Sequence, residues 1–174
     1  NPYPEWLGGI RNTFSWKGLS LTGLLDLRQG QSLWGGTIGR LNRLGVTKQT
    51  EARDKVYVIE GVKTDGTPND IPISANSYFA AYLGDGGAAQ EQLVFDGSWV
   101  RLRELTLSYA LPKCLKGVQN ISVYVTGRNI WLDTPYPGVD PETSLTGAGS
   151  NIGGFDYFNN PGAKSWIFGV NIGL

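Results

Sequence analysis

The feature that most restricts the fold of this chain is a set of five segments in which apolar and polar residues alternate with a period of two. Such alternation is typical of β-strands that have one apolar and one polar face. In the last segment, for example, Trp166, Phe168 and Val170 share one face. The pattern predicts an all-β chain with strands at about residues 8–17, 19–28, 99–111, 119–131 and 164–174.

The connections between these segments alternate between short and long. Lys17-Gly18 is a tight turn and a short connection follows the third segment, whereas about 29–97 and about 132–163 are long and rich in Gly, Asp and Asn. Outer-membrane barrels have short periplasmic turns and long extracellular loops. A soluble domain seldom holds two loops of this length without a functional reason. The order predicts a transmembrane antiparallel β-barrel fragment with two long extracellular loops and a periplasmic C-terminus.

Aromatic residues stand at the ends of the predicted strands, on their apolar faces. Trp6 and Trp16 share a face and lie ten positions apart. At ~3.3 Å per residue and a strand tilt of about 40°, ten residues span roughly 25 Å along the membrane normal, which is the height of the apolar band of a barrel. Amphipathic rings favour the membrane interface. The predicted membrane-interface aromatics are Trp6, Trp16, Tyr109, Trp131 and Trp166.

Composition argues against several other classes of protein. No apolar run reaches the length of about 18 residues that a transmembrane helix needs. The 15 basic and 15 acidic residues balance to a net charge of zero, so a nucleic-acid partner is not expected. His is absent and Cys114 is the only Cys, which leaves no basis for an internal disulfide or a Cys/His site. We therefore expect no enzymatic activity, no catalytic residue, no cofactor and no metal.

The third segment contains one conflict of phase. Leucines such as Leu107 set its outward phase, yet Arg101 and Arg103 share the same parity. A charge on the lipid face at the bilayer midplane would cost ~2–4 kcal/mol. Either a β-bulge near Arg103–Glu104 switches the outward phase to Val100 and Leu102, or this stretch rises above the bilayer, and we predict the bulge.

Several segments also resemble one family, the SusC/RagA transporters. The run GSWVRLRELTLSYALP (97–112) is similar to a family signature in which a Gly-Ser-aromatic lead precedes an Arg-Leu-Arg strand. The runs ISVYVTGRNIW (121–131), PGVDPE (137–142) and FGVNIGL (168–174) resemble its penultimate strand, a loop signature and its closing strand. LGGIRNTFSWKGLSLTGLLDLRQG (7–30) resembles an upstream hairpin. The matches follow one another in the family's order over nearly the whole chain.

The resemblance implies the last five strands of a barrel of about 22 strands, in the outer membrane of a Gram-negative, Bacteroidetes-like bacterium. Such transporters carry a plug and a TonB box and import glycans or peptides with a SusD-like surface lipoprotein. The implied partners are the remainder of the barrel and plug, the lipid bilayer, the SusD-like lipoprotein, TonB through a box outside this chain, and an oligosaccharide or peptide substrate. Five strands cannot close such a barrel. We therefore expect residues 1–174 to be the C-terminal part of a larger transporter.

The long loops hold aromatic side chains that could stack on sugar rings or pack against the lipoprotein. Packing of the loops on themselves is the competing interpretation. A short helix is expected near Asn76 to Leu83. The candidate contact residues are Trp34, Tyr78, Tyr82, Tyr136, Tyr157 and Phe158.

Two acidic motifs each allow a functional and a structural interpretation. DGTPND (65–70) offers oxygen ligands for calcium but lacks the spacing of an EF-hand, and a Pro/Gly turn with solvated acids is the simpler interpretation. Asp140 and Glu142 could be the paired carboxylates of a glycosidase, although their place around Pro141 favours bracing of the loop.

Charged residues on the predicted inner face could line the lumen, form cross-strand ladders or grip the plug. They are Arg11, Lys17, Asp26, Arg28, Glu104 and Arg128. The leading prediction is thus part of a TonB-dependent nutrient importer. Two alternatives remain open at this stage, a soluble all-β carbohydrate-binding module and a simple porin-type barrel.

Overall fold

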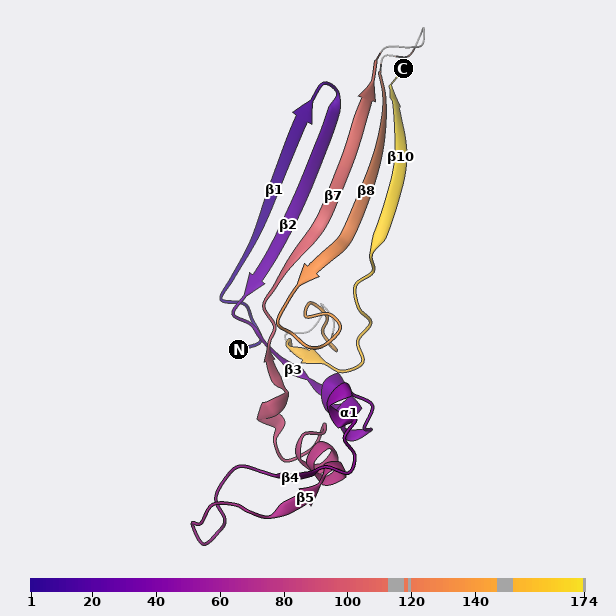
Figure 1. Cartoon of the computed structure of the whole chain (residues 1–174). Helices are drawn as coiled ribbons and strands as arrows, with labels where there is room; N and C mark the ends of the chain where they lie inside the picture. The colour runs from indigo at the N-terminus through magenta and orange to yellow at the C-terminus, as the bar shows by residue number, and fades with distance from the viewer. Residues whose placement is uncertain (113–117, 119, 147–151, 174) are drawn as a thin grey trace.

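The computed structural model describes residues 1–112, 118, 120–146 and 152–173. Its largest element is an antiparallel sheet of five strands in the order β1-β2-β7-β8-β10. Figure 1 shows these strands as one layer, with the other described elements gathered at the end opposite the β1–β2 turn. The strands are β1 (Trp6–Trp16), β2 (Leu19–Gln29), β7 (Trp99–Leu111), β8 (Asn120–Asp133) and β10 (Ser165–Gly173). The predicted all-β class is confirmed.

The two faces of this sheet differ in polarity, as the alternation predicts. One face, here called the hydroxyl face, carries threonine pairs whose Oγ1 atoms hydrogen-bond across strands. The Oγ1 atoms are 3.0 Å apart in Thr13 and Thr22 and 2.8 Å apart in Thr106 and Thr126. The other face is apolar and uncovered, and Phe168 on it is 77% exposed. An uncovered apolar face of this size calls for an apolar environment outside the chain, and in a membrane barrel lipid supplies that environment.

Two glycines allow large rings to lie flat across the outermost strand pair. Gly169 is the register partner of Tyr124, and a Cβ at Gly169 would collide with the Tyr124 ring. On the apolar face, a Cβ at Gly127 would lie 2.9 Å from the Trp166 ring. Each ring occupies the space that a side chain on the opposite residue would fill. Because only glycine leaves this space free, the two ring–glycine pairs fix the register of β10 on β8.

The predicted β-bulge is confirmed at Arg103. In the β2–β7 pairing, Leu24 pairs with Glu104 and Leu25 pairs with Leu102, so Arg103 has no partner. Because Leu25 belongs to the apolar face, the shift brings Leu102 onto that face. The extra residue thus reverses the phase of β7 and takes both of its arginines away from lipid.

The outer strands of the sheet, β1 and β10, each pair with one neighbour only in the described part of the chain. Their free edges present unpaired backbone N–H and C=O groups, which are costly in a membrane. The five strands therefore form a section of a wall rather than a closed barrel.

The two long connections fold together into one unit, here called the loop assembly, which comprises the described residues of 30–98 and 134–164. β3 pairs antiparallel with β6 and parallel with β9, so both connections contribute to one small sheet. No helix of the described residues is long and apolar enough to cross a membrane. The elements are β3 (Ser32–Gly35), α1 (Gly36–Arg43), η1 (Lys48–Thr50), β4 (Val56–Val58), β5 (Pro72–Ser74), η2 (Ser77–Tyr82), η3 (Gln90–Leu93), β6 (Val94–Asp96) and β9 (Phe155–Asp156).

The helix expected near 76–83 is present as η2, a π-helix. Helix α1 was not predicted, because its sequence GTIGRLNR begins with glycine and has only two large apolar residues. Tertiary packing explains those glycines. A Cβ at Gly36 would collide with the Trp34 ring, and one at Gly39 would lie 2.6 Å from Leu93 and 2.9 Å from the backbone nitrogen of Asp85.

The chain's own apolar core lies in the loop assembly and not in the sheet. Apart from Trp99, which is the first residue of β7, the buried apolar side chains of the described residues belong to the connections. They are Leu33, Ala75, Phe79, Ala89, Leu93, Trp99 and Tyr136. The loop assembly is therefore a packed structure, while the sheet leaves its apolar face for another environment.

Candidate functional site

A cluster around Trp99 joins the loop assembly to the sheet. Trp99 is only 1% exposed. The guanidinium carbons of Arg28, Arg101 and Arg103 lie 5.6, 5.4 and 5.5 Å from its ring centroid. A cation over an indole face is attracted by the ring quadrupole, and this attraction is stronger where water is excluded. The end of β2 and the start of β7 thus hold three positive charges close together, which need anionic partners.

Asp140 supplies the partner of Arg101 from the second long connection. Arg101 Nη2 donates to Asp140 Oδ1 at 2.6 Å, and both side chains are buried. The backbone N–H groups of Glu142 and Gly162 also donate to the carboxylate, each at 3.0 Å. Burial alone would raise the pKa of Asp140, but these backbone donors and Arg101 outweigh it, so the net pKa is lowered.

Arg103, which the bulge directs away from lipid, bridges two further acids. Its Nη2 donates to Asp26 Oδ2 at 2.7 Å and to Glu142 Oε1 at 2.9 Å. Asp140 and Glu142 therefore both hold the loop to β7, which confirms the bracing interpretation. The conflicting parity of the two arginines was the one sequence signal that pointed to this cluster.

A second group of residues, here called the aromatic platform, consists of Trp34, Tyr157 and Phe158. Trp34 and Tyr157 stack with ring centroids 6.2 Å apart and an interplanar angle of 16°. Phe158 meets Tyr157 edge-on at 5.3 Å and is 56% exposed. Its φ of 56° lies in the left-handed region, which is rare for a bulky residue and costs about 1–3 kcal/mol.

Hydrogen bonds from α1 and β9 hold this strained backbone. The Phe158 N–H donates to Thr37 Oγ1 at 2.7 Å, and that hydroxyl donates to Asp156 Oδ1 at 2.9 Å. Because its backbone is fixed while its ring is exposed, Phe158 is presented to the surroundings rather than packed into the core.

The Tyr157 hydroxyl joins an ion pair beneath the platform. Arg40 Nε lies 2.9 Å from Asp85 Oδ2, and Arg40 Nη2 donates to the Tyr157 oxygen at 2.8 Å. The Tyr157 hydroxyl in turn donates to Asp85 Oδ2 at 3.0 Å. The hydrogen bond to Tyr157 raises the pKa of Arg40. This network orients the central ring of the platform.

Tyr78 and Tyr82 lie in a separate cluster on η2. Tyr78 stacks on Tyr57 with centroids 4.3 Å apart, and Tyr82 lies 5.7 Å from Tyr78. Phe79 meets both Tyr57 and Tyr78 edge-on. These contacts are packing of the loop on itself.

Tyr136 is buried at 4% exposure, and its hydroxyl donates to Asp156 Oδ2 at 2.6 Å. Burial raises its pKa. In this structure the side chain supports the platform from within and is not open to a ligand, so Tyr136 does not join the exposed contact residues.

The five predicted interface aromatics share the apolar face and fall at its two ends. Trp16 pairs with Leu19, and Leu19 pairs with Tyr109, so the two rings occupy one row at the turn end. Trp6 is the first residue of β1, Trp166 the second of β10 and Trp131 the third from the end of β8, and Figure 1 shows these ends of the three strands on the side of the loop assembly. Their exposed fractions run from 39% for Tyr109 to 70% for Trp16.

Charges on the hydroxyl face form a cross-strand ladder. Glu104 lies 3.7 Å from Arg11 and 3.4 Å from Arg128, measured between nitrogen and oxygen. Exposed pairs of this kind contribute little to stability individually. The ladder thus sets two arginines against one glutamate, while the hydroxyl pairs Thr13–Thr22 and Ser15–Ser20 lie nearer the β1–β2 turn.

The DGTPND segment forms a compact turn. Asp65 Oδ1 accepts hydrogen bonds from the Thr67 hydroxyl at 2.6 Å and the Thr67 N–H at 2.9 Å, and the pKa of Asp65 is lowered by them. Lys63 pairs with Asp70 at 3.0 Å. Within the described ranges no three His, Cys, Asp or Glu side chains come together as metal ligands would. Cys114 lies outside the described residues.

Among known proteins, the chain is similar in sequence to TonB-dependent receptors. No family model matches the chain. It is 27% identical over 180 aligned residues to TonB-dependent receptor P26 of Formosa agariphila, covering 99% of this chain and 17% of that protein. It is 37% identical over 87 residues to TonB-dependent receptor P3 of the same organism, covering 45% of this chain and 9% of that protein. Both relatives are TonB-dependent receptors by name.

Solved structures agree on the fold. The chain matches a structure of the RagAB peptide transporter with a TM-score of 0.67 and 21% identity, over 98% of this chain and 17% of that chain. A structure of the RagAB peptide importer in the open-open state gives a TM-score of 0.68 and 22% identity. The chain thus spans less than a fifth of the length of the relatives that it matches.

Proposed function

We propose that this chain belongs with the SusC/RagA-like TonB-dependent transporters and supplies a section of barrel wall and two outer loops to a nutrient importer of the outer membrane. The observation that carries the proposal is the sheet itself. It has five antiparallel strands, one uncovered apolar face edged by aromatics, and one hydroxyl face. The match to a TonB-dependent receptor over 99% of the chain supports the same conclusion.

In the proposed orientation, the β1–β2 turn and the C-terminus face the periplasm and the loop assembly faces the exterior. The alternation of short and long connections supports this orientation, because barrels of this class keep their short turns periplasmic. The hydroxyl face then lines the interior, and the two rows of aromatics lie at the two membrane interfaces.

The partners and substrate follow from the family. The remaining strands would close the barrel, a plug would fill it, and TonB would engage a box elsewhere in the whole protein. A SusD-like lipoprotein would cover the loop assembly, and the imported molecule would be a peptide or an oligosaccharide. The exposed Phe158 ring supports a contact role for the aromatic platform.

The test is the composition of the native assembly. Outer membranes are extracted with detergent, the assembly is purified, and its polypeptides are weighed before and after denaturation. We expect this sequence within a much larger polypeptide that copurifies with a lipoprotein. A folded, detergent-free species with the mass of this chain alone would refute the proposal and favour a soluble β-sheet module.

Substitution of Phe158 by alanine tests the aromatic platform. Because alanine removes the ring, we expect the affinity of the assembly for its substrate to fall about 3- to 10-fold, as a lost aromatic contact implies. Val139→Ala, at another exposed apolar residue of the same connection, is the matched control and leaves affinity unchanged. Equal losses in both variants would show that the ring has no specific role.

A further inference from the structure

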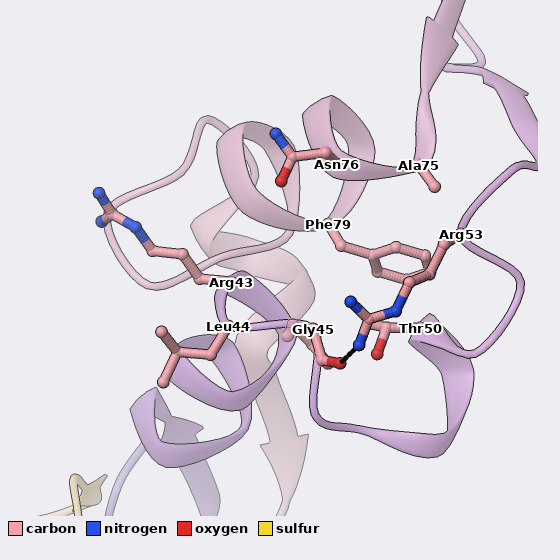
Figure 2. Close-up of a pocket in the computed structure, with 9 residues that line it drawn as sticks. Arg43, Leu44, Gly45, Thr50, Arg53, Ala75, Asn76 and Phe79 are labelled. Carbon is pink, nitrogen blue, oxygen red and sulfur yellow. Dashed lines mark hydrogen bonds between the residues drawn. The ribbon is translucent and has the colours of Figure 1, made fainter.

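The loop assembly contains a cavity that the proposed function does not use. It has a volume of about 140 Å³ and lies between α1, η1 and η2. Figure 2 shows its lining, with the Phe79 ring and the Arg53 side chain facing the same space. Here called the Arg53 pocket, it is lined by Asn42, Arg43, Leu44, Gly45, Thr50, Arg53, Ala75, Asn76 and Phe79.

The floor of the pocket is formed by buried and hydrogen-bonded side chains. Ala75 and Phe79 are buried apolar residues, while Asn42 and Thr50 are buried polar ones. Asn42 Oδ1 accepts hydrogen bonds from Thr47 Oγ1 at 2.9 Å and from Gln49 Nε2 at 2.5 Å. Since the amide oxygen is occupied in this way, the amide nitrogen is the end of Asn42 that remains to donate.

The charge of the pocket is positive. Its nine lining residues include two arginines and no carboxylate. Arg53 Nη2 donates to the Gly45 carbonyl at 3.0 Å, the bond dashed in Figure 2, and no ion pair of Arg53 is present in the described part of the chain. Arg43 extends away from Phe79 and donates to the Asp85 carbonyl at 3.3 Å. Arg53 is therefore the cation available at the pocket.

The adjoining depression does not reverse this charge. It shares Gly45, Thr50 and Arg53 with the pocket and adds Lys48 and Glu51. Glu51 forms no ion pair with Arg53. The charges of Glu51 and Lys48 cancel, so the net charge of the residues lining both depressions stays positive.

We infer that the Arg53 pocket binds a carboxylate carried on a compact apolar or ring-bearing group. A guanidinium is the best bidentate partner for a carboxylate, the Asn42 amide nitrogen offers a further donor, and Phe79 with Ala75 forms an apolar wall for the attached group. The inference rests on the proposed function, because the carboxylate would belong to the imported molecule. Both a peptide C-terminus and an acidic sugar carry this chemistry.

The test uses the whole transporter purified in detergent and ligand-observed NMR titrations. The peptide probes are N-acetylphenylalanine and its uncharged amide, and the sugar probes are glucuronic acid and glucose. We expect at least one acid to bind about tenfold or more tightly than its neutral counterpart, since one charge-assisted contact is lost in the latter. The preferred acid identifies the source of the carboxylate. Equal binding of both acids and their neutral counterparts would overturn the inference.

Variants separate the pocket from general effects of charge. Arg53→Gln is expected to weaken binding of the preferred acid about tenfold, while Arg53→Lys retains part of the affinity because it keeps the charge. Lys55→Gln removes one positive charge two positions away, at a side chain that stacks on Tyr57 and does not line the pocket, and it leaves affinity unchanged. Equal affinity of Arg53→Gln and the parent protein would also overturn the inference. Neither result alters the mass-based test of the importer.

Discussion

Substitution of Asp140 by alanine is expected to release the second long connection from the sheet at a cost of about 3–5 kcal/mol. Asp140 and Arg101 form a buried ion pair, and they are 6% and 3% exposed. Without the carboxylate, Arg101 keeps its charge in a site that excludes water, its remaining anionic partner is Glu142 with Oε2 3.6 Å from Arg101 Nε, and the Gly162 N–H loses its acceptor. The loss is therefore mainly the penalty of an incompletely compensated buried charge and not the net value of the pair.

Limited proteolysis and thermal unfolding of the detergent-extracted assembly measure this effect. We expect early cleavage within residues 134–164 and a lowered unfolding temperature for Asp140→Ala. Asp133→Ala, which removes an exposed acid, is the control and changes neither. In the double variant Asp140→Leu with Arg101→Met no charge is left buried, so much of the stability should return. A double variant as unstable as Asp140→Ala would show that the pair is not the cause.

We expect the protease resistance of residues 134–164 to depend on pH through the ionisation of Asp140. The pKa of Asp140 is lowered in the folded protein, so the ionised carboxylate contributes stability above its unfolded pKa of about 3.9. That contribution is lost as pH falls below this value and through the lower folded pKa. The acid sensitivity of the loop should be absent in Asp140→Leu with Arg101→Met.

The second large effect is expected on the apolar face. Leu107 pairs with Leu21 and Val125 on that face and lies between Leu105 and the interface residue Tyr109. Arginine at this position would face the hydrocarbon core and should cost up to ~2–4 kcal/mol of barrel stability, the cost at the bilayer midplane. We expect Leu107→Arg to reduce the amount of folded transporter in the outer membrane, measured by its heat-dependent mobility in gels.

The adjacent residue supplies a matched control. Ser108 pairs with Ser20 and Tyr124 on the hydroxyl face, so arginine there would reach an aqueous interior. Ser108→Arg should assemble to a level much closer to that of the parent protein. Equal loss of folded transporter in the two variants would contradict the assignment of the faces, whereas the expected difference would support lipid contact for one face alone.

The strands and their two faces could be predicted from the sequence because a period of two repeats locally along each strand. The bulge could be predicted for a related reason. Once Leu107 sets the outward phase, Arg101 and Arg103 are tolerable only if one extra residue shifts that phase. Both inferences depend on residues near one another in the chain.

The loop assembly could not be predicted in the same way. Helix α1 forms from a glycine-rich segment because Gly36 fits against the rings of Trp34 and the distant Tyr157, and Gly39 fits against the distant Leu93 and Asp85. Tyr136 looked like the other loop aromatics, yet it is buried against Asp156. Phe158 is distinguished from its neighbours only by its positive φ and its exposure.

The sequence by itself determined the class of the fold, which residues share a face within each strand, and the alternation of short and long connections. These features follow from local periodicity and from turn chemistry. The tertiary structure alone decided which acids pair with Arg101 and Arg103, which aromatics are exposed, and that Arg53 and Phe79 share a cavity. Those outcomes depend on contacts between segments that are distant along the chain, and no local pattern of residues encodes such contacts.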